Sequence, residues 1–173
     1  THPFATQITR NAITAASAVG CPLVRLERPA WWAQPGDDWI AVRNEAEAAA
    51  MLPTGMRVLL ALGRQHIAPF AARADIHFVM RMIDPPQAAL PPDHELVLAR
   101  PGDCASEMRF LADRKIGRIV CRNSGGAASY AKIEAARRLG LPVTMIERPP
   151  LPAVDIVATA AEAVAFVRSR FGF

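Results

Sequence analysis

The sequence has 173 residues, of which 51% are apolar and 21% are charged, and its formal net charge is +4. These proportions are typical of a globular protein that buries a core, and no apolar run approaches the roughly 20 residues that a membrane-spanning helix needs. No N-terminal segment resembles a signal peptide, so we expect a cytoplasmic protein that does not bind a membrane. Since the basic residues form no cluster beside aromatic residues, we also expect no binding of nucleic acid.

The cysteines do not suggest a disulfide framework or a structural zinc site. Cys21, Cys104 and Cys121 form no CxxC pair, and three cysteines cannot all pair with one another. The histidines at positions 77 and 94 have no neighbours at metal-ligand spacing. We therefore predict no metal.

The order of the predicted elements is typical of an α/β protein with mostly parallel sheets. In the first part of the chain, helical patterns cover residues 8–19 and 44–52. From residue 57 onward, predicted strands cover residues 58–62, 77–83, 95–99, 118–122 and 142–146. Predicted helices in the same region cover residues 67–73, 105–115, 127–139 and 160–171.

Two segments of the chain repeat each other. Residues 20–29 read G-C-P-L-V-R-L-E-R-P, and residues 140–149 read G-L-P-V-T-M-I-E-R-P. Coincidence could account for Glu-Arg-Pro alone, but helical patterns before and after both copies favour duplication of a βα domain. We therefore expect two Rossmann-like lobes, with residues 1–55 forming the second half of an N-terminal lobe and residues 56–173 a complete C-terminal lobe. Because the sequence begins with Thr1, we expect the first strands of the N-terminal lobe to precede it.

The strongest local signal is a loop that follows the predicted strand 118–122. The loop consists of Asn123, Ser124, Gly125 and Gly126. Glycines let a ligand approach the backbone closely, and free amides at the start of a helix near residue 127 favour a phosphate or carboxylate. Tyr130 and Lys132 fall in the first two turns of that helix, on different faces. A serine cap followed by a glycine turn would give the same pattern without a ligand.

Further polar residues fall where ligands of parallel sheets collect, at the carboxyl ends of strands. These residues are Gly63, Arg64, Arg81 and Arg100 and, by the repeat, Thr1 and His2. Arginine forks bind carboxylates and phosphates, although a solvated surface explains any single arginine equally well. A lone histidine is also commonly a helix cap or a core residue.

The ordered combination of several segments resembles the precorrin-6A reductases, and the resemblance covers essentially the whole chain. The matching segments are residues 1–5 (T-H-P-F-A), Gly63-Arg64, Arg81, the loop 123–126, residues 132–136 (K-I-E-A-A) and residues 146–149 (I-E-R-P). Two features depart from the family. Residues 99–102 read A-R-P-G where family members often have A-R-G-P, and the family's Gly-rich opening segment has no counterpart here.

The resemblance implies two Rossmann-like lobes and an NADPH-dependent reduction of one double bond of precorrin-6A, which gives precorrin-6B in cobalamin biosynthesis. The implied substrate is an anionic tetrapyrrole, and other enzymes of the corrin pathway are candidate partners. The alternatives are a non-catalytic nucleotide-binding module and another NAD(P)-linked reductase on the same fold.

From the resemblance and the strand-end positions we assign three groups of residues. We expect cofactor binding by Gly63, Arg64, Asn123, Ser124, Gly125, Gly126 and Lys132. We expect substrate binding by Thr1, Arg81 and Arg100. His2 and Tyr130 are the candidate catalytic residues, as donors of the proton that accompanies hydride transfer. For His2 we favour the alternative that it orients a substrate carboxylate or caps the helix, because water can deliver the proton in an accessible cleft.

Overall fold

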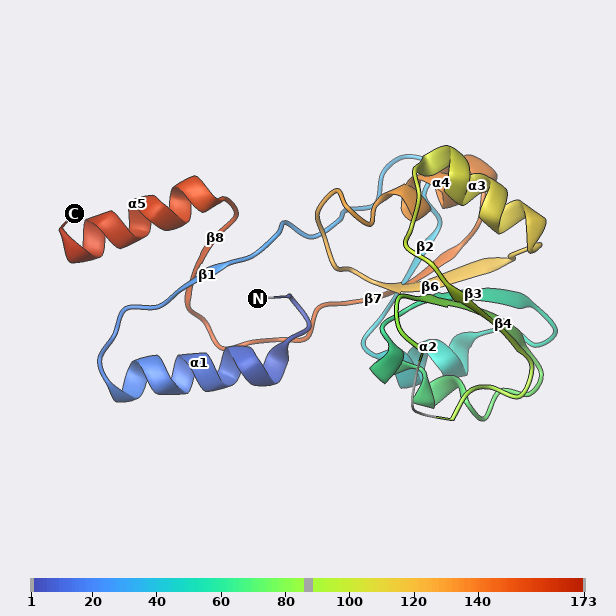
Figure 1. Ribbon diagram of the computed structural model, residues 1–173, viewed down its shortest axis with the longest axis horizontal. Coiled ribbons are helices and arrows are strands. Elements are labelled where there is room, and N and C mark those ends of the chain that lie inside the picture. Colours follow the sequence, from blue (N-terminus) through green and yellow to red (C-terminus); the bar gives the residue numbers. More distant parts are fainter. Residues whose placement is uncertain (1, 86–88, 173) are drawn as a thin grey trace. The chain divides into compact units, whose positions relative to one another are not determined.

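The computed structural model describes residues 2–85 and 89–172, which form two compact units (Figure 1). The first unit comprises the residues up to Trp31, the loop Ser124–Gly126 and the residues from Arg148 onward. The second unit comprises Trp32–Asn123 and Ala127–Glu147.

The second unit is built on one parallel sheet. Its strands are β2 (Trp39–Val42), β3 (Arg57–Ala61), β4 (His77–Met82), β5 (His94–Leu98), β6 (Arg118–Arg122) and β7 (Val143–Ile146). They are arranged in the order β2-β7-β6-β3-β4-β5, and every neighbouring pair is parallel. The carboxyl ends of all six strands therefore lie along one edge.

Helices cover both faces of this sheet, as a parallel sheet requires. On one face, α3 (Cys104–Asp113) and α4 (Ala131–Leu139) pack against each other, and α2 (Glu45–Met51) lies on the other face (Figure 1). The central strands are accordingly apolar and buried, and all four residues of β7 are inaccessible to solvent. Side chains define two of the helix starts: Asp103 accepts the Ser106 amide at 2.8 Å, and Asn44 accepts the Glu47 amide at 2.9 Å.

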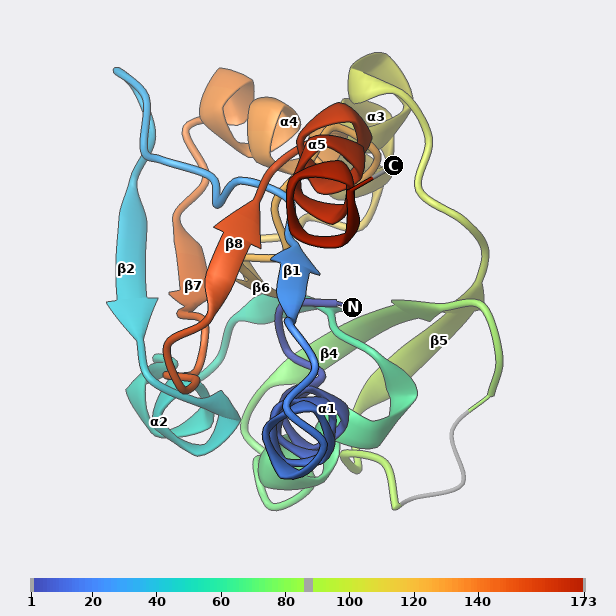
Figure 2. The ribbon, with the colours of Figure 1, turned by 90° about the vertical axis from the view of Figure 1, so that its left-hand side faces the viewer.

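The first unit holds a second, smaller parallel sheet. It pairs β1 (Val24–Leu26) with β8 (Asp155–Val157). The helices α1 (Thr6–Ala18) and α5 (Ala160–Phe171) lie on opposite sides of this pair (Figure 2). A capping box formed by Thr159 and Glu162 begins α5.

The two copies of the sequence repeat have the same order of elements but exchange strands. The first copy runs α1-β1-β2-α2, and the second runs α4-β7-β8-α5. The first strand of each copy pairs with the second strand of the other, because β1 pairs with β8 and β7 pairs with β2. As a result β2 and α2 belong to the second unit, and a single boundary between residues 55 and 56 does not separate the compact units. The assignment of two lobes, the first of them incomplete, stays a prediction.

The predicted fold class is confirmed, since the chain is α/β with parallel sheets. Two details of the prediction were wrong. The predicted helix at residues 67–73 is replaced by two 3₁₀ turns, η1 (Arg64–His66) and η2 (Ala68–Phe70). Pro69 lacks the amide that would bond the Gln65 carbonyl and continue the turn begun at Arg64 as one helix. The helix expected near residue 127 begins at Ala131, after a turn in which the Tyr130 amide bonds the Ala127 carbonyl.

Candidate functional site

The carboxyl edge of the second unit's sheet carries several of the predicted site residues. Asn123 follows β6, Gly63 and Arg64 follow β3, Arg81 lies near the end of β4, and Arg100 follows β5. Because β6, β3, β4 and β5 are neighbours in the sheet, these positions are brought to adjacent strand ends. Arg64 and Arg100 are exposed, so their guanidinium groups are accessible to a ligand.

Arg81 is engaged inside the protein. Its side chain is 5% exposed and meets the 1% exposed carboxylate of Glu107 at 2.8 and 2.6 Å. The same carboxylate accepts the backbone amide of Gly102 at 2.9 Å, which fixes the loop after β5 to α3. The geometry thus gives Arg81 a role in holding this loop, and its predicted contact with substrate stays a prediction.

Tyr130 takes part in a polar chain at the start of α4. Arg137 donates a hydrogen bond to the Tyr130 hydroxyl at 2.5 Å and to the two oxygens of Asp37 at 2.9 and 3.1 Å. The Asp37 carboxylate, followed by the Tyr130 hydroxyl, raises the pKa of Arg137 above its usual value. The Tyr130 hydroxyl is thereby held beside a cationic side chain at the start of α4.

Lys132 is buried rather than exposed at the loop. Its side chain is 6% exposed, and its ammonium group donates to the Ser129 carbonyl at 2.7 Å. Burial lowers the pKa of Lys132. The observed contact is with the turn that precedes α4, and the predicted contact with cofactor stays a prediction.

The glycine loop Ser124–Gly126 packs within the first unit. Gly125 and Gly126 have φ values of 68° and 74°, in the left-handed region that glycine adopts readily. A Cβ atom at Gly125 would run into the carbonyl oxygen of Pro29, and one at Gly126 would lie 2.8 Å from Cδ of Arg28. The indole of Trp31 donates to the Gly126 carbonyl at 2.8 Å. Both glycines are therefore needed for close packing against residues 28–31.

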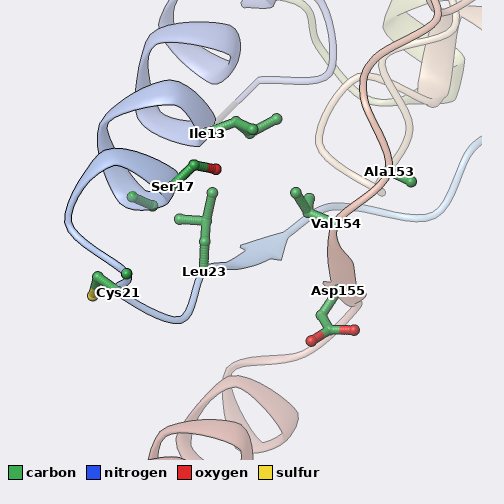
Figure 3. Close-up of a pocket in the computed structure, with 9 residues that line it drawn as sticks. Ile13, Ser17, Cys21, Leu23, Ala153, Val154 and Asp155 are labelled. Atoms are coloured by element: carbon green, nitrogen blue, oxygen red, sulfur yellow. The ribbon is translucent and has the colours of Figure 1, made fainter.

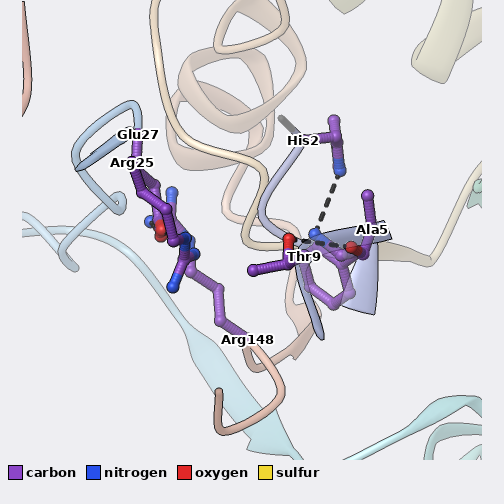
Figure 4. Close-up of polar contacts among 7 residues, drawn as sticks. His2, Ala5, Thr9, Arg25, Glu27 and Arg148 are labelled. Atoms are coloured by element: carbon purple, nitrogen blue, oxygen red, sulfur yellow. Dashed lines mark hydrogen bonds and ion pairs between the residues drawn. The ribbon is translucent and has the colours of Figure 1, made fainter. Parts of the chain in front are cut away.

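Sequence reasoning missed a charged cluster beside this loop. Glu27 accepts hydrogen bonds from Arg25 and from Arg148, the latter at 2.7 Å. Figure 4 draws these three side chains. Arg25 and Glu27 face the same way because side chains alternate along an extended segment. The repeated Glu-Arg-Pro triplet was the signal that could have pointed to this cluster, since Glu27 comes from one copy and Arg148 from the other.

His2 lies just before α1 and is exposed. Its Nδ1 accepts the amide of Phe4 at 3.2 Å, which leaves the proton of the neutral ring on Nε2 (Figure 4). The histidine thus organises the backbone that leads into the helix. Thr1, the neighbouring predicted residue, lies outside the described residues.

A second cluster missed by sequence reasoning lies at the carboxyl edge of the large sheet. Glu45, at the start of α2, is 3.1 Å from Nδ1 of His66 and accepts two hydrogen bonds from Arg122 at 3.1 and 2.9 Å. These bonds, led by that of His66, lower the pKa of Glu45 to about 2. The carboxylate therefore stays ionised at neutral pH. Nothing in the residue spacing links position 45 with positions 66 and 122.

The first unit also contains an open pocket of about 570 Å³ that lies away from the predicted residues (Figure 3). Ile13 and Ser17 of α1 and Val154 and Asp155 of the β8 segment contribute to its wall. None of the predicted site residues lines it. In the part of the chain that the structure describes, no group of His, Cys, Asp or Glu residues is placed to hold a metal ion. No helix in the same ranges is long and apolar enough to cross a membrane.

Comparison with known proteins assigns the family. The family model described as "Precorrin-6x reductase CbiJ/CobK" matches residues 1–168. A precorrin-6A reductase of Rhodococcus erythropolis is 48% identical over 96% of this chain and 68% of its own length. One from Rhodobacter capsulatus is 45% identical over 92% of this chain and 64% of its own length. The chain thus spans about two thirds of the length of these relatives.

A solved structure agrees with the sequence comparisons. The structure titled "CobK precorrin-6A reductase" superposes with a TM-score of 0.92 at 42% identity, covering 99% of this chain and 69% of that one. At this identity the likeness extends beyond the fold to the protein family. The chain belongs to the precorrin-6x reductase family.

Proposed function

We propose that this chain carries out the reaction of a precorrin-6A reductase, in which NADPH reduces one double bond of the tetrapyrrole precorrin-6A to give precorrin-6B. The observation that carries the proposal is the family match over residues 1–168, together with relatives of that name at 45–48% identity. The enzyme would act in the cytoplasm, and other enzymes of the corrin pathway would supply its substrate and take up its product.

The residues present fit two anionic ligands. NADPH carries a pyrophosphate and a ribose phosphate, and the tetrapyrrole carries acetate and propionate side chains. Arg64 and Arg100 are exposed at the ends of β3 and β5, where ligands of parallel sheets bind, and guanidinium groups suit both kinds of anion. The loop Asn123–Gly126 follows β6, and we propose that it contacts the cofactor, although its two glycines pack against residues 28–31.

The main role of the protein is to hold the cofactor and the tetrapyrrole in the relative orientation that hydride transfer needs. The bound cofactor would supply the hydride, and the chain's own residues would orient it, exclude competing geometries and deliver a proton. We propose Tyr130 as the proton donor, since its hydroxyl lies beside Arg137, and we propose that the exposed ring of His2 orients a substrate carboxylate. We also propose that Lys132 contributes to cofactor binding by holding the turn at Ser129.

The experiment that tests the proposal is the loss of NADPH absorbance after addition of precorrin-6A, with NADH and a reaction lacking substrate as comparisons. Arg64→Ala should weaken binding by roughly ten- to a hundred-fold, the cost of a lost charged contact. Lys132→Ala should also weaken cofactor binding. Arg138→Ala is the matched control, because Arg138 is an exposed arginine near the C-terminal end of α4, where it pairs with Glu134.

The two alternatives predict different outcomes of the same experiment. A non-catalytic nucleotide-binding module would bind NADPH without oxidising it in the presence of precorrin-6A. Another NAD(P)-linked reductase would leave precorrin-6A unchanged and oxidise NADPH with a different acceptor. Unchanged kinetic constants in both Arg64→Ala and Lys132→Ala would remove their assigned roles.

A further inference from the structure

Three arginines and one glutamate of the first unit lie next to the glycine loop. Glu27 lies between Arg25 and Arg148 and accepts a hydrogen bond from each (Figure 4). Arg28 follows Glu27 directly, and its aliphatic stem packs against Gly126. We refer to Arg25, Glu27, Arg28 and Arg148 as the arginine cluster.

The arginine cluster carries more positive charge than it neutralises internally. Three guanidinium groups and one carboxylate leave a net charge of +2. The side chains of Arg25, Glu27 and Arg148 are only 11%, 14% and 19% exposed, and charges withdrawn from water are screened less by salt. An anion that reaches the cluster would therefore be attracted more strongly than at an ordinary surface arginine.

Two arginines of the cluster, Arg25 and Arg28, have donors that Glu27 does not take up. The Nε of Arg25 is buried and has no hydrogen-bond partner within the described ranges. Arg28 likewise has no ion-pair partner among the residues that the structure describes. A second oxyanion would satisfy donors that Glu27 cannot.

The backbone around the arginines is fixed before any ligand arrives. The Trp31 indole anchors the carbonyl of Gly126, and the carbonyl of Pro29 lies against Gly125. Only glycine at positions 125 and 126 allows the loop to approach Pro29 and Arg28 so closely. Side chains held in this way lose little entropy when a ligand binds, which favours affinity.

The position of the cluster in the fold is the one at which ligands of parallel sheets bind. Glu27 follows the last residue of β1, and its amide bonds the carbonyl of Val157 in the neighbouring strand β8 at 2.9 Å. Glu27 and Arg28 therefore lie at the carboxyl end of this parallel pair.

We propose that the arginine cluster is an oxyanion-binding site that takes a carboxylate or phosphate group of a ligand of this protein. Glu27 holds Arg25 and Arg148 in place, and Arg28 supplies the guanidinium that is free to form a forked contact. The identity of the ligand, either the phosphates of the cofactor or the acetate and propionate groups of the tetrapyrrole, rests on the function proposed above. The existence of the site does not.

The test is a binding titration on the full chain with two probes, NADP⁺ and uroporphyrin, a stable tetrapyrrole that bears acetate and propionate groups. The variants are Arg28→Gln and Arg25→Gln, and the control is Arg10→Gln, which removes an exposed arginine of α1 in the same unit. We expect Arg28→Gln to lower the affinity for at least one probe by roughly ten-fold or more, while Arg10→Gln binds both probes as the parent does. The probe whose affinity falls shows whether the oxyanion comes from the cofactor or from the tetrapyrrole.

Two results would overturn the site: equal affinity of the parent and both variants for each probe, or no binding of either probe to the parent. Thermal unfolding of each variant separates loss of binding from loss of fold, and Arg28→Gln removes no ion pair. The proposed function can fail separately. If the parent does not oxidise NADPH with precorrin-6A but Arg28→Gln still loses affinity for a probe, the oxyanion site is supported and the proposed reaction is refuted. If the parent oxidises NADPH but Arg28→Gln binds both probes like the parent, the reaction is supported and the oxyanion site is refuted.

Discussion

Arg81 of β4 and Glu107 of α3 form a two-point ion pair, with N–O distances of 2.8 and 2.6 Å, and both side chains are almost completely buried. The Gly102 amide adds a third bond to the same carboxylate. The pair also lies against the ring of Phe110, whose centroid is 4.7 Å from the guanidinium carbon of Arg81. One carboxylate thus joins a strand, a helix and the loop that follows β5.

Glu107→Gln should lower the free energy of unfolding by about 3 kcal/mol or more, because removing one partner leaves a buried charge uncompensated. Urea unfolding at neutral pH measures the effect. The matched control is Glu134→Gln on α4, whose exposed pair with Arg138 should contribute less than about 1 kcal/mol. Equal losses in the two variants would contradict the importance of the buried pair.

Glu45 should contribute stability that disappears in acid. Its pKa is about 2 in the folded chain, against 4.5 for an unperturbed glutamate, chiefly because of the hydrogen bond from His66. Since the folded pKa is the lower one, the ionised carboxylate stabilises the fold above about pH 4.5, and this contribution fades as the pH falls toward 2.

Glu45→Gln should therefore have a lower free energy of unfolding than the parent at neutral pH. The two free energies should converge as the pH falls from about 4.5 to 2. Urea unfolding across this range would show the convergence. Glu147→Gln, at an exposed glutamate of the same unit, serves as the control. A difference that stays constant down to the lowest pH would refute the assignment.

Gly125→Ala should cost more than Gly20→Ala, although both glycines have left-handed φ values, of 68° and 64°. A Cβ atom at Gly20 meets nothing within 4 Å, so this variant should lose only the roughly 1–2 kcal/mol of a left-handed alanine. At Gly125 the Cβ atom collides with the Pro29 carbonyl, and overpacking adds about 1–3 kcal/mol. Equilibrium denaturation of the two variants measures the loss in the free energy of unfolding. Equal losses would show that the loop can move away from Pro29.

His2→Asn should keep most of the activity, because asparagine can accept the Phe4 amide as Nδ1 does now. His2→Ala should lose that contact and show weaker substrate binding. Steady-state kinetics over a range of pH distinguishes orientation from proton donation. A fall in kcat of about a hundred-fold in His2→Asn, with KM unchanged, would instead identify His2 as a general acid.

The strands of the large sheet could be read from the sequence because a parallel sheet is buried on both faces. Short apolar runs such as residues 119–121, flanked by Arg118 and Arg122, gave β6 with the observed bounds. The strand β2 was not found, since its four residues include Trp39 and follow a polar turn. The strand β8 has only three residues, two of them exposed, and carries no such signal.

The strand-end residues of the candidate site were predictable in position but not in their contacts. Periodicity and the parallel arrangement indicated that Arg64, Arg81 and Arg100 would fall at one edge of the sheet. The burial of Arg81 depends on Glu107, which lies 26 positions further along the chain, and no local pattern reports that pairing. The arginine cluster depends on Glu27 and Arg148, 121 positions apart, and only the repeat hinted at it.

The strand exchange has a consequence for how the chain acquires its structure. All six strands of the large sheet are complete once Ile146 has been made, whereas β1, near the beginning, must wait for β8 at Asp155–Val157. Closing so long a loop is slow, because the chain loses entropy before the contact forms. During synthesis β1 is therefore made well before β8, so the pairing of β1 with β8, and the arginine cluster beside it, form only after the strands of the large sheet have been made.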